Sequence, residues 1–134
     1  MVDMESKVIE QIAKEARLSG KWRYPDNHLF CQKRGSGNNW ACGFCVNGPK
    51  ESDAILNMVQ TEVEKCDRLD GFLTLLSLAG GTGSGLGAYV TQRLRDEFPH
   101  SFLLNQVVWP YSTGEVIVQN YNAALTLFPS LPDQ

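Results

Sequence analysis

The sequence predicts an α/β fold in which a mostly parallel sheet carries helices on both faces, and three observations lead to this prediction. Residues 71–78 form a nearly continuous apolar run, as expected of a strand buried on both faces. A segment with helical spacing of its apolar residues, 86–98, follows after a glycine-rich turn. A second apolar run, 102–109, completes a strand–helix–strand unit, and such units join parallel strands by a right-handed crossover.

The glycine-rich turn at residues 79–85 has the surroundings of a phosphate cradle. Glycines let the backbone approach an anion closely, and the start of the following helix supplies free N–H groups, to which Thr82 and Ser84 add hydroxyl donors. The Walker A loop is excluded because Leu86 stands where its lysine belongs. A relaxed dinucleotide fingerprint, Gly83-x-Gly85-x-x-Ala88, remains open, although no acidic residue ends the next strand. Glycines that only allow a helix to pack closely on a sheet are the structural alternative.

The N-terminal segment predicts a helix preceded by two acidic residues. Apolar residues recur at helical spacing over residues 6–18, with Ser6 as the expected N-cap and Ser19-Gly20 as the expected stop. Asp3 and Glu5 stand just before this helix. Their carboxylates either favour the positive end of the helix dipole or hold a magnesium ion or its water shell, because hard cations take carboxylate oxygens.

The remaining segments complete the outline of the fold. Residues 20–40 are predicted to form a long irregular connection that ends in a second glycine loop. A helix from Glu51 to Cys66 is expected after the break at Gly48-Pro49, and a last helix is expected from Glu115 to Leu127.

Three loops are expected to meet at one edge of the sheet: residues 34–39, 79–85 and 110–115. The last two follow strands, and open α/β sheets bind ligands beyond the carboxyl ends of their strands. The segment 3–5, with its acidic residues Asp3 and Glu5, is a further candidate for this edge. No hydroxyl nucleophile paired with a histidine base is indicated, so no catalytic residue is assigned.

The composition is that of one ordinary globular domain, with 134 residues of which 43% are hydrophobic and 20% are charged. The net charge of −3 argues against nucleic acid as a partner, because proteins that bind it usually carry a basic patch. No run approaches the ~20 apolar residues of a membrane span, and the acidic N-terminus lacks the features of a signal peptide. We therefore expect a cytosolic protein without a membrane partner.

The cysteines are expected to be reduced thiols, as is usual in the cytosol. Cys42 and Cys45 have the spacing of one half of a zinc site, but no second pair follows. Cys31 and His28 do not complete any standard spacing. The sequence therefore gives little support to a zinc centre.

The glycine turn and two further loops resemble the tubulin family. Residues 79–85 are similar to the tubulin signature, in which a Gly-Gly-Thr-Gly-Ser-Gly core follows a buried strand. Residues 35–41 and 2–5 resemble two other tubulin loops, in the same order and at similar separations. Residues 107–122 resemble the delta subfamily more than the alpha or beta chains. The resemblance covers residues 1–127, and residues 128–134 are read as a divergent tail.

The resemblance implies a Rossmann-like GTP-binding domain of the tubulin and FtsZ type, with GTP and Mg²⁺ as ligands. The glycine turn would bind the β- and γ-phosphates through backbone N–H groups, and the glycine loop at residues 36–38 would approach the γ-phosphate. Asp3 and Glu5 match acidic positions near the magnesium ion. The nucleotide-binding residues that the resemblance implies are Ser36, Gly37, Asn38, Ser77, Gly80, Gly81, Thr82, Gly83, Ser84, Gly85, Gly114, Glu115 and Gln119.

The chain departs from the family pattern in two respects. Alpha and beta tubulins carry a glutamate near the ribose, whereas Gln119 is a neutral amide without the charge assistance that strengthens a hydrogen bond. Family members also begin with a strand and a Gly-Gln-Cys-Gly-Asn-Gln loop, and they continue with guanine-contacting segments, a core helix and two further domains. These parts are not found in the 134 residues, so we expect the chain to be a fragment of one domain.

For function, the resemblance implies a GTP-binding cytoskeletal protein of microtubule-based processes, located in the cytoplasm at centrioles, basal bodies and cilia. Its partners would be other tubulin subunits or centriolar and microtubule proteins. GTP hydrolysis stays open, because a structural subunit with little nucleotide turnover fits the same residues. A dinucleotide-binding domain is the remaining alternative, and retention of NAD(H) by the purified chain would indicate it.

A fragment of a parallel sheet leaves backbone groups unpaired and apolar helix faces uncovered. We therefore expect the 134-residue chain, on its own, to bind GTP weakly or not at all and to aggregate. Size-exclusion chromatography, thermal melting and GTP titration check this expectation. A monomer that melts cooperatively and binds GTP with micromolar affinity would show it to be wrong.

Overall fold

The computed structural model describes residues 1–127 and confirms the α/β class with parallel strand pairs. The predicted tail, residues 128–134, lies outside the described residues. The chain divides into two compact units, one of residues Met1–Gly35 and one that begins at Ser36.

The first unit pairs two short strands beside one helix. Strand β1 (Val2–Asp3) pairs in parallel with β2 (Phe30–Cys31), and α1 (Ser6–Ser19) follows β1. The apolar stripe of α1 buries Ile9 and Ala16. Gly20 ends the helix in the left-handed conformation, φ 65°, which glycine adopts without a steric penalty.

Two predictions for this unit are wrong in detail. The N-cap of α1 is Glu5 rather than Ser6, and its side chain makes no capping hydrogen bond. The connection after the helix is not irregular throughout, because it contains a 3₁₀ turn at Asp26–His28 and strand β2. A strand of two residues is too short to produce an alternating pattern in the sequence. Strand β2 is therefore recognised only from its pairing with β1 in the structure.

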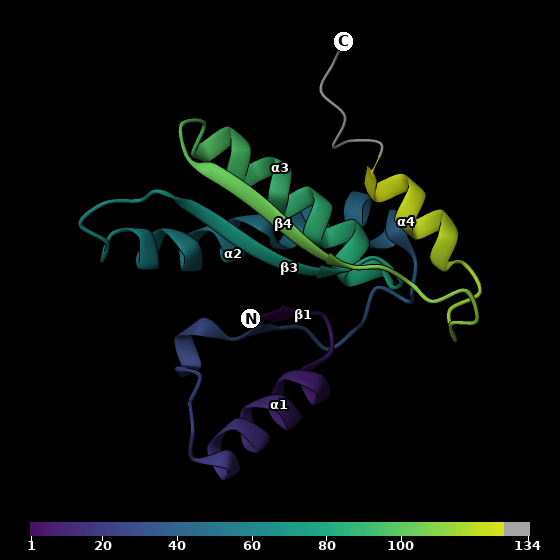
Figure 1. Cartoon of the computed structure of the whole chain (residues 1–134), viewed down its shortest axis with the longest axis horizontal. Helices are drawn as coiled ribbons and strands as arrows, with labels where there is room; N and C mark the ends of the chain where they lie inside the picture. Colours follow the sequence, from purple (N-terminus) through teal and green to yellow (C-terminus); the bar gives the residue numbers. More distant parts are fainter. Residues whose placement is uncertain (128–134) are drawn as a thin grey trace. The chain divides into compact units, whose positions relative to one another are not determined.

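The second unit contains the predicted strand–helix–strand motif (Figure 1). Strand β3 (Gly71–Ser77) runs parallel to β4 (Phe102–Val108), with Gly71 opposite Phe102 and Ser77 opposite Val108. Helix α3 (Gly87–Glu97) connects them and buries Ala88 and Leu94. The Phe72 and Phe98 rings lie 5.1 Å apart between their centroids, which fixes the far end of this helix on the sheet.

Two helices begin earlier than predicted, because each is extended by a π-helical segment. Cys42–Asn47 leads into α2 (Gly48–Val63), and Thr82–Leu86 leads into α3. Gly48-Pro49 therefore lies inside a continuous helical segment instead of breaking it. Pro49 stands in the first turn of α2, where the hydrogen-bond pattern changes from the π-helical segment to the α-helix.

The last helix begins later than predicted. Helix α4 spans Gln119–Leu127, and residues 115–118 form a turn before it. Ile117 is 96% exposed, so no apolar contact draws this turn into the helix.

Strand β3 is not buried on both faces as predicted. Its even-numbered side chains face α3, where Leu76 lies against Gly87. The odd-numbered Leu73 and Leu75 are 64% and 74% exposed. In the part of the chain that the structure describes, the β3–β4 pair is thus covered on one face, and its other face also exposes Phe102 and Val108. No helix among residues 1–127 is both long and apolar enough to cross a membrane.

Candidate functional site

The two glycine loops of the second unit are residues 36–39, the first loop, and residues 79–85, the glycine turn. They lie against each other, as predicted. The hydroxyl oxygens of Ser36 and Thr82 are 3.3 Å apart, within hydrogen-bonding distance. Ser36 is only 3% exposed, and the side-chain amide of Asn47 donates to its Oγ over 3.0 Å. Segments 46 residues apart in the sequence are therefore joined through the buried hydroxyl group of Ser36 and the half-buried one of Thr82.

The glycines of the turn allow two backbones to approach closely. A Cβ atom on Gly81 would lie 2.6 Å from the carbonyl oxygen and 2.7 Å from the backbone nitrogen of Asn39, closer than real Cβ contacts allow. A Cβ atom on Gly85 would collide with the carbonyl group of Trp40 and lie 2.9 Å from the backbone nitrogen of Phe44. Both glycines therefore have a packing role, but their contacts are with the backbone of residues 39–44 and not with a sheet as the structural alternative supposed. This packing places the glycine turn beside residues 36–39.

The exposed part of this arrangement is smaller than the predicted set. Gly81, Ser84 and Gly85 are buried, and the Ser84 hydroxyl donates to the carbonyl of Gly80. Of the predicted residues, three in the turn are half-buried (Gly80, Thr82 and Gly83) and two before Asn39 are exposed (Gly37 and Asn38).

The first loop turns through two residues in the left-handed region. Gly37 has φ 59° and Asn38 has φ 53°. Glycine and asparagine are the residues that adopt this conformation most readily, so the Gly-Asn pair fits the turn that the loop requires.

Helix α4 joins both loops through two buried side chains that were not predicted from the sequence. The Asn122 amide donates to the carbonyl oxygens of Asn38 and Ala79, each over 2.8 Å. Its Oδ1 accepts the backbone N–H of Trp40 over 3.0 Å. One turn later, the Thr126 hydroxyl donates to the carbonyl of Ser84 over 3.0 Å. The signal in the sequence was polar residues at helical spacing on the buried face of a predicted helix.

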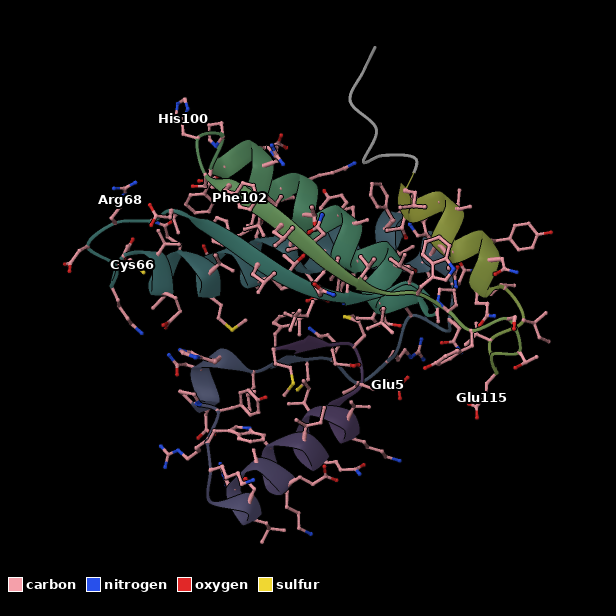
Figure 2. The ribbon with its side chains drawn as sticks, in the orientation of Figure 1. Glu5, Cys66, Arg68, His100, Phe102 and Glu115 are labelled. Atoms are coloured by element: carbon pink, nitrogen blue, oxygen red, sulfur yellow. The ribbon has the colours of Figure 1, made fainter. Side chains whose placement is uncertain are left out.

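The loop after β4 is held by Gln119, the residue predicted to approach a ribose. Its side chain is almost completely buried, packs against Gly114 and donates to the carbonyl of Tyr111. Gln119 thus fixes the turn in this structure and does not present its amide to solvent. Glu115 is exposed and points away from the ribbon (Figure 2). Ser77 lies exposed at the end of β3, where its backbone contacts Gly83.

The two predicted metal ligands lie in the first unit, where Asp3 ends strand β1 and Glu5 is the N-cap of α1. Glu5 is labelled in Figure 2. The Asp3 carboxylate accepts the backbone N–H of Glu5 over 2.8 Å, and the exposed Glu5 side chain lies against Gly35. Residues 1–127 contain no group of three or more histidine, cysteine or acidic side chains that could hold a metal ion. Mg²⁺ is usually held by one or two carboxylates, waters and substrate phosphates, so a carboxylate pair fits it better than zinc. The assignment of Asp3 and Glu5 remains a prediction.

Neutral hydrogen-bond donors characterise the two loops. Residues 36–39 and 79–85 contain hydroxyl, amide and glycine residues and no ionisable side chain. Helix N-termini and backbone N–H groups attract anions through their partial positive charge. The arrangement suits the binding of a phosphate group, and it supplies neither a general base nor a fixed cation.

The combination of parallel strands, a glycine turn that enters a helix and a second glycine loop has a counterpart among known proteins. The family model described as "Tubulin/FtsZ family, GTPase domain" matches residues 1–129. The chain therefore belongs to the Tubulin/FtsZ family, within the part that forms the GTPase domain.

Individual relatives refine this assignment. The chain is 61% identical over 127 residues to the tubulin delta chain of Mus musculus and 58% identical to that of Homo sapiens. It is 38% identical over 128 residues to a tubulin beta chain of Cicer arietinum. The higher similarity to delta chains confirms the prediction made from residues 107–122. Each alignment covers 95% of this chain, which spans 28% of the length of these relatives.

The contact between the two loops generates a stability prediction. Gly81→Ala places a Cβ atom against the Asn39 backbone, and we expect it to lower the free energy of unfolding by roughly 1–3 kcal/mol, as overpacking does. Gly80→Ala is the matched control, because its Cβ would meet only the Asn38 side-chain oxygen, at 3.2 Å. Urea unfolding of both variants checks this. Equal losses at the two positions would contradict the close contact.

Proposed function

We propose that this chain forms the phosphate-binding part of a GTP site in a tubulin-type cytoskeletal protein. One observation supports the proposal most directly. The glycine loops 36–39 and 79–85, both with neutral donors, are held together, and residues 79–85 follow the carboxyl end of a parallel strand and enter a helix. Membership of the Tubulin/FtsZ family makes GTP the nucleotide that this arrangement would take.

Each predicted residue has a proposed role. Backbone N–H groups within residues 80–85 bind the β- and γ-phosphates, with Thr82 adding a hydroxyl. Residues 36–38 approach the γ-phosphate. Asp3 and Glu5 hold Mg²⁺ or its water shell, and the metal would offset the phosphate charge. Residues 112–115 border the ribose, and Ser77 lies near the nucleotide at the end of its strand.

The buried position of Gln119 modifies its proposed role. Its amide already donates to Tyr111, so we propose that it shapes the loop that borders the ribose. Direct contact with the ribose would need a different side-chain position. This loss of one direct contact is compatible with a site whose affinity depends chiefly on the phosphates.

We place nucleotide binding ahead of nucleotide turnover. Phosphoryl transfer to water requires a residue that orients the attacking water, together with groups that stabilise charge on the phosphates. Residues 36–39 and 79–85 supply the charge-stabilising donors and contain no ionisable side chain. Hydrolysis by the whole protein would therefore depend on residues outside these loops.

The magnesium role generates the central test. In the longest chain that the natural transcript encodes, Mg²⁺ should strengthen GTP binding. Asp3→Asn and Glu5→Gln should each remove most of that gain, about tenfold, as expected for one charge-assisted contact. Titrations of GTP with and without Mg²⁺ measure the effect.

Glu10→Gln is the matched control. Glu10 is exposed on α1, and its substitution removes the same charge as Glu5→Gln. Wild-type protein that binds NAD(H) and not GTP would refute the proposed function. An unchanged Mg²⁺ dependence in both variants would refute only the metal assignment.

We further propose that the protein acts in microtubule-based structures, at centrioles, basal bodies and cilia, with other tubulin subunits or centriolar proteins as partners. The similarity to proteins named tubulin delta chain supports this. We expect the epitope-tagged protein to co-localise with centriole markers in ciliated cells, and diffuse staining in both dividing and ciliated cells would contradict it. The matched control is an equally expressed tagged protein of the same size.

A further inference from the structure

Asn122 uses the full donor capacity of its side chain to connect segments that are distant in the sequence. Its amide nitrogen donates to the carbonyl oxygens of Asn38 and Ala79, both over 2.8 Å. Its Oδ1 accepts the N–H of Trp40, where the first loop enters its helix. A side-chain amide has two N–H donors, so both are used on two different loops.

The burial of this side chain makes its hydrogen bonds consequential. Asn122 is 3% exposed, so water cannot replace a bond that is lost. An unsatisfied buried donor or acceptor costs more than the net value of the bond itself. Substitution at this position would therefore leave two backbone carbonyls, one on each loop, without their partner.

The bond to Ala79 also orients the glycine turn. In a trans peptide the C=O of one residue and the N–H of the next point in opposite directions. The carbonyl of Ala79 points to Asn122, so the N–H of Gly80 points away from α4. Gly80 is the first glycine of the proposed phosphate-binding set and is half-buried.

We infer that Asn122 is a positioning residue that fixes the two glycine loops relative to each other and thereby sets the preference for a nucleoside triphosphate. The inference rests on the proposed function. If residues 36–38 contact the γ-phosphate and residues 80–85 contact the β- and γ-phosphates, their mutual position determines how well the terminal phosphate is held. The amide itself touches backbone carbonyls and not the nucleotide.

Two substitutions and one matched control test this inference. Asn122→Ala removes all three hydrogen bonds, and Asn122→Asp retains the shape but replaces the donor with an acceptor. Asn120→Asp makes the same chemical change on the same helix at an exposed position. All are made in the longest chain that the natural transcript encodes.

The first measurement is the affinity for GTP and for GDP. We expect Asn122→Ala to weaken GTP binding about tenfold, the effect of losing one or two buried hydrogen bonds, and to weaken GDP binding less. The preference for GTP over GDP therefore falls. A loss of folded protein would lower both affinities equally, so a lower GTP preference distinguishes positioning from general destabilisation.

The second measurement, hydrogen exchange of the backbone amides without nucleotide, does not depend on GTP. Protection should fall at residues 36–40 and 79–85 together in both Asn122 variants, with β3 and β4 unchanged and Asn120→Asp like wild type. If Asn122→Asp does not fold, the exchange pattern of Asn122→Ala alone tests the inference.

The outcomes separate the inference from the proposed function. Wild-type protein without affinity for GTP would refute the proposed function, and exchange at the two loops would still show whether Asn122 fixes them. Unchanged GTP preference and unchanged loop protection in Asn122→Ala would overturn the inference while the proposed function stands. Loss of protection at one loop alone would also overturn it.

Discussion

The close approach of two backbones is the constraint on which the second unit depends. The glycine turn and the helical segment that begins near Trp40 touch through backbone atoms, so no side chain is tolerated at Gly81 or Gly85. This contact brings Ser36 to Thr82 and places the first loop beside the turn. Glycine costs conformational entropy when it becomes ordered, and here that cost is offset by packing that any larger residue would prevent.

Helix α4 adds hydrogen bonds to both loops that this backbone contact brings together. Its buried face carries polar side chains, and Asn122 donates to a backbone carbonyl group of each of the two loops. Gln119 does the same for the loop after β4. One helix therefore organises all three loops at the carboxyl ends of β3 and β4, and this requirement explains why its inward face is not apolar.

The strands β3 and β4 could be predicted from continuous apolar runs, and the longer helices could be predicted from apolar residues at helical spacing. The prediction misplaced the helix starts, since glycine and proline usually mark a break, and the close packing of Gly81 and the first-turn position of Pro49 override that tendency. The exposure of Leu73 was not predicted, because an apolar run in the sequence does not show which face of the sheet a helix covers. The glycine loops were predicted from their composition. Asn122 was not, because polar residues at helical spacing indicate a polar face of α4 but not the distant backbone groups that this face contacts.

The hydrogen bonds of Asn122 also bear on the order in which the fold forms. Strands β3 and β4 pair residues 31 apart, such as Thr74 and Asn105, whereas Asn122 reaches back 84 residues to Asn38. Closing the longer loop from the unfolded chain costs roughly 0.9 kcal/mol more in chain entropy, so the local strand–helix–strand unit is favoured to assemble first. The two glycine loops then acquire their final positions only when α4 docks, and the end of the chain's folding coincides with the completion of its phosphate-binding surface.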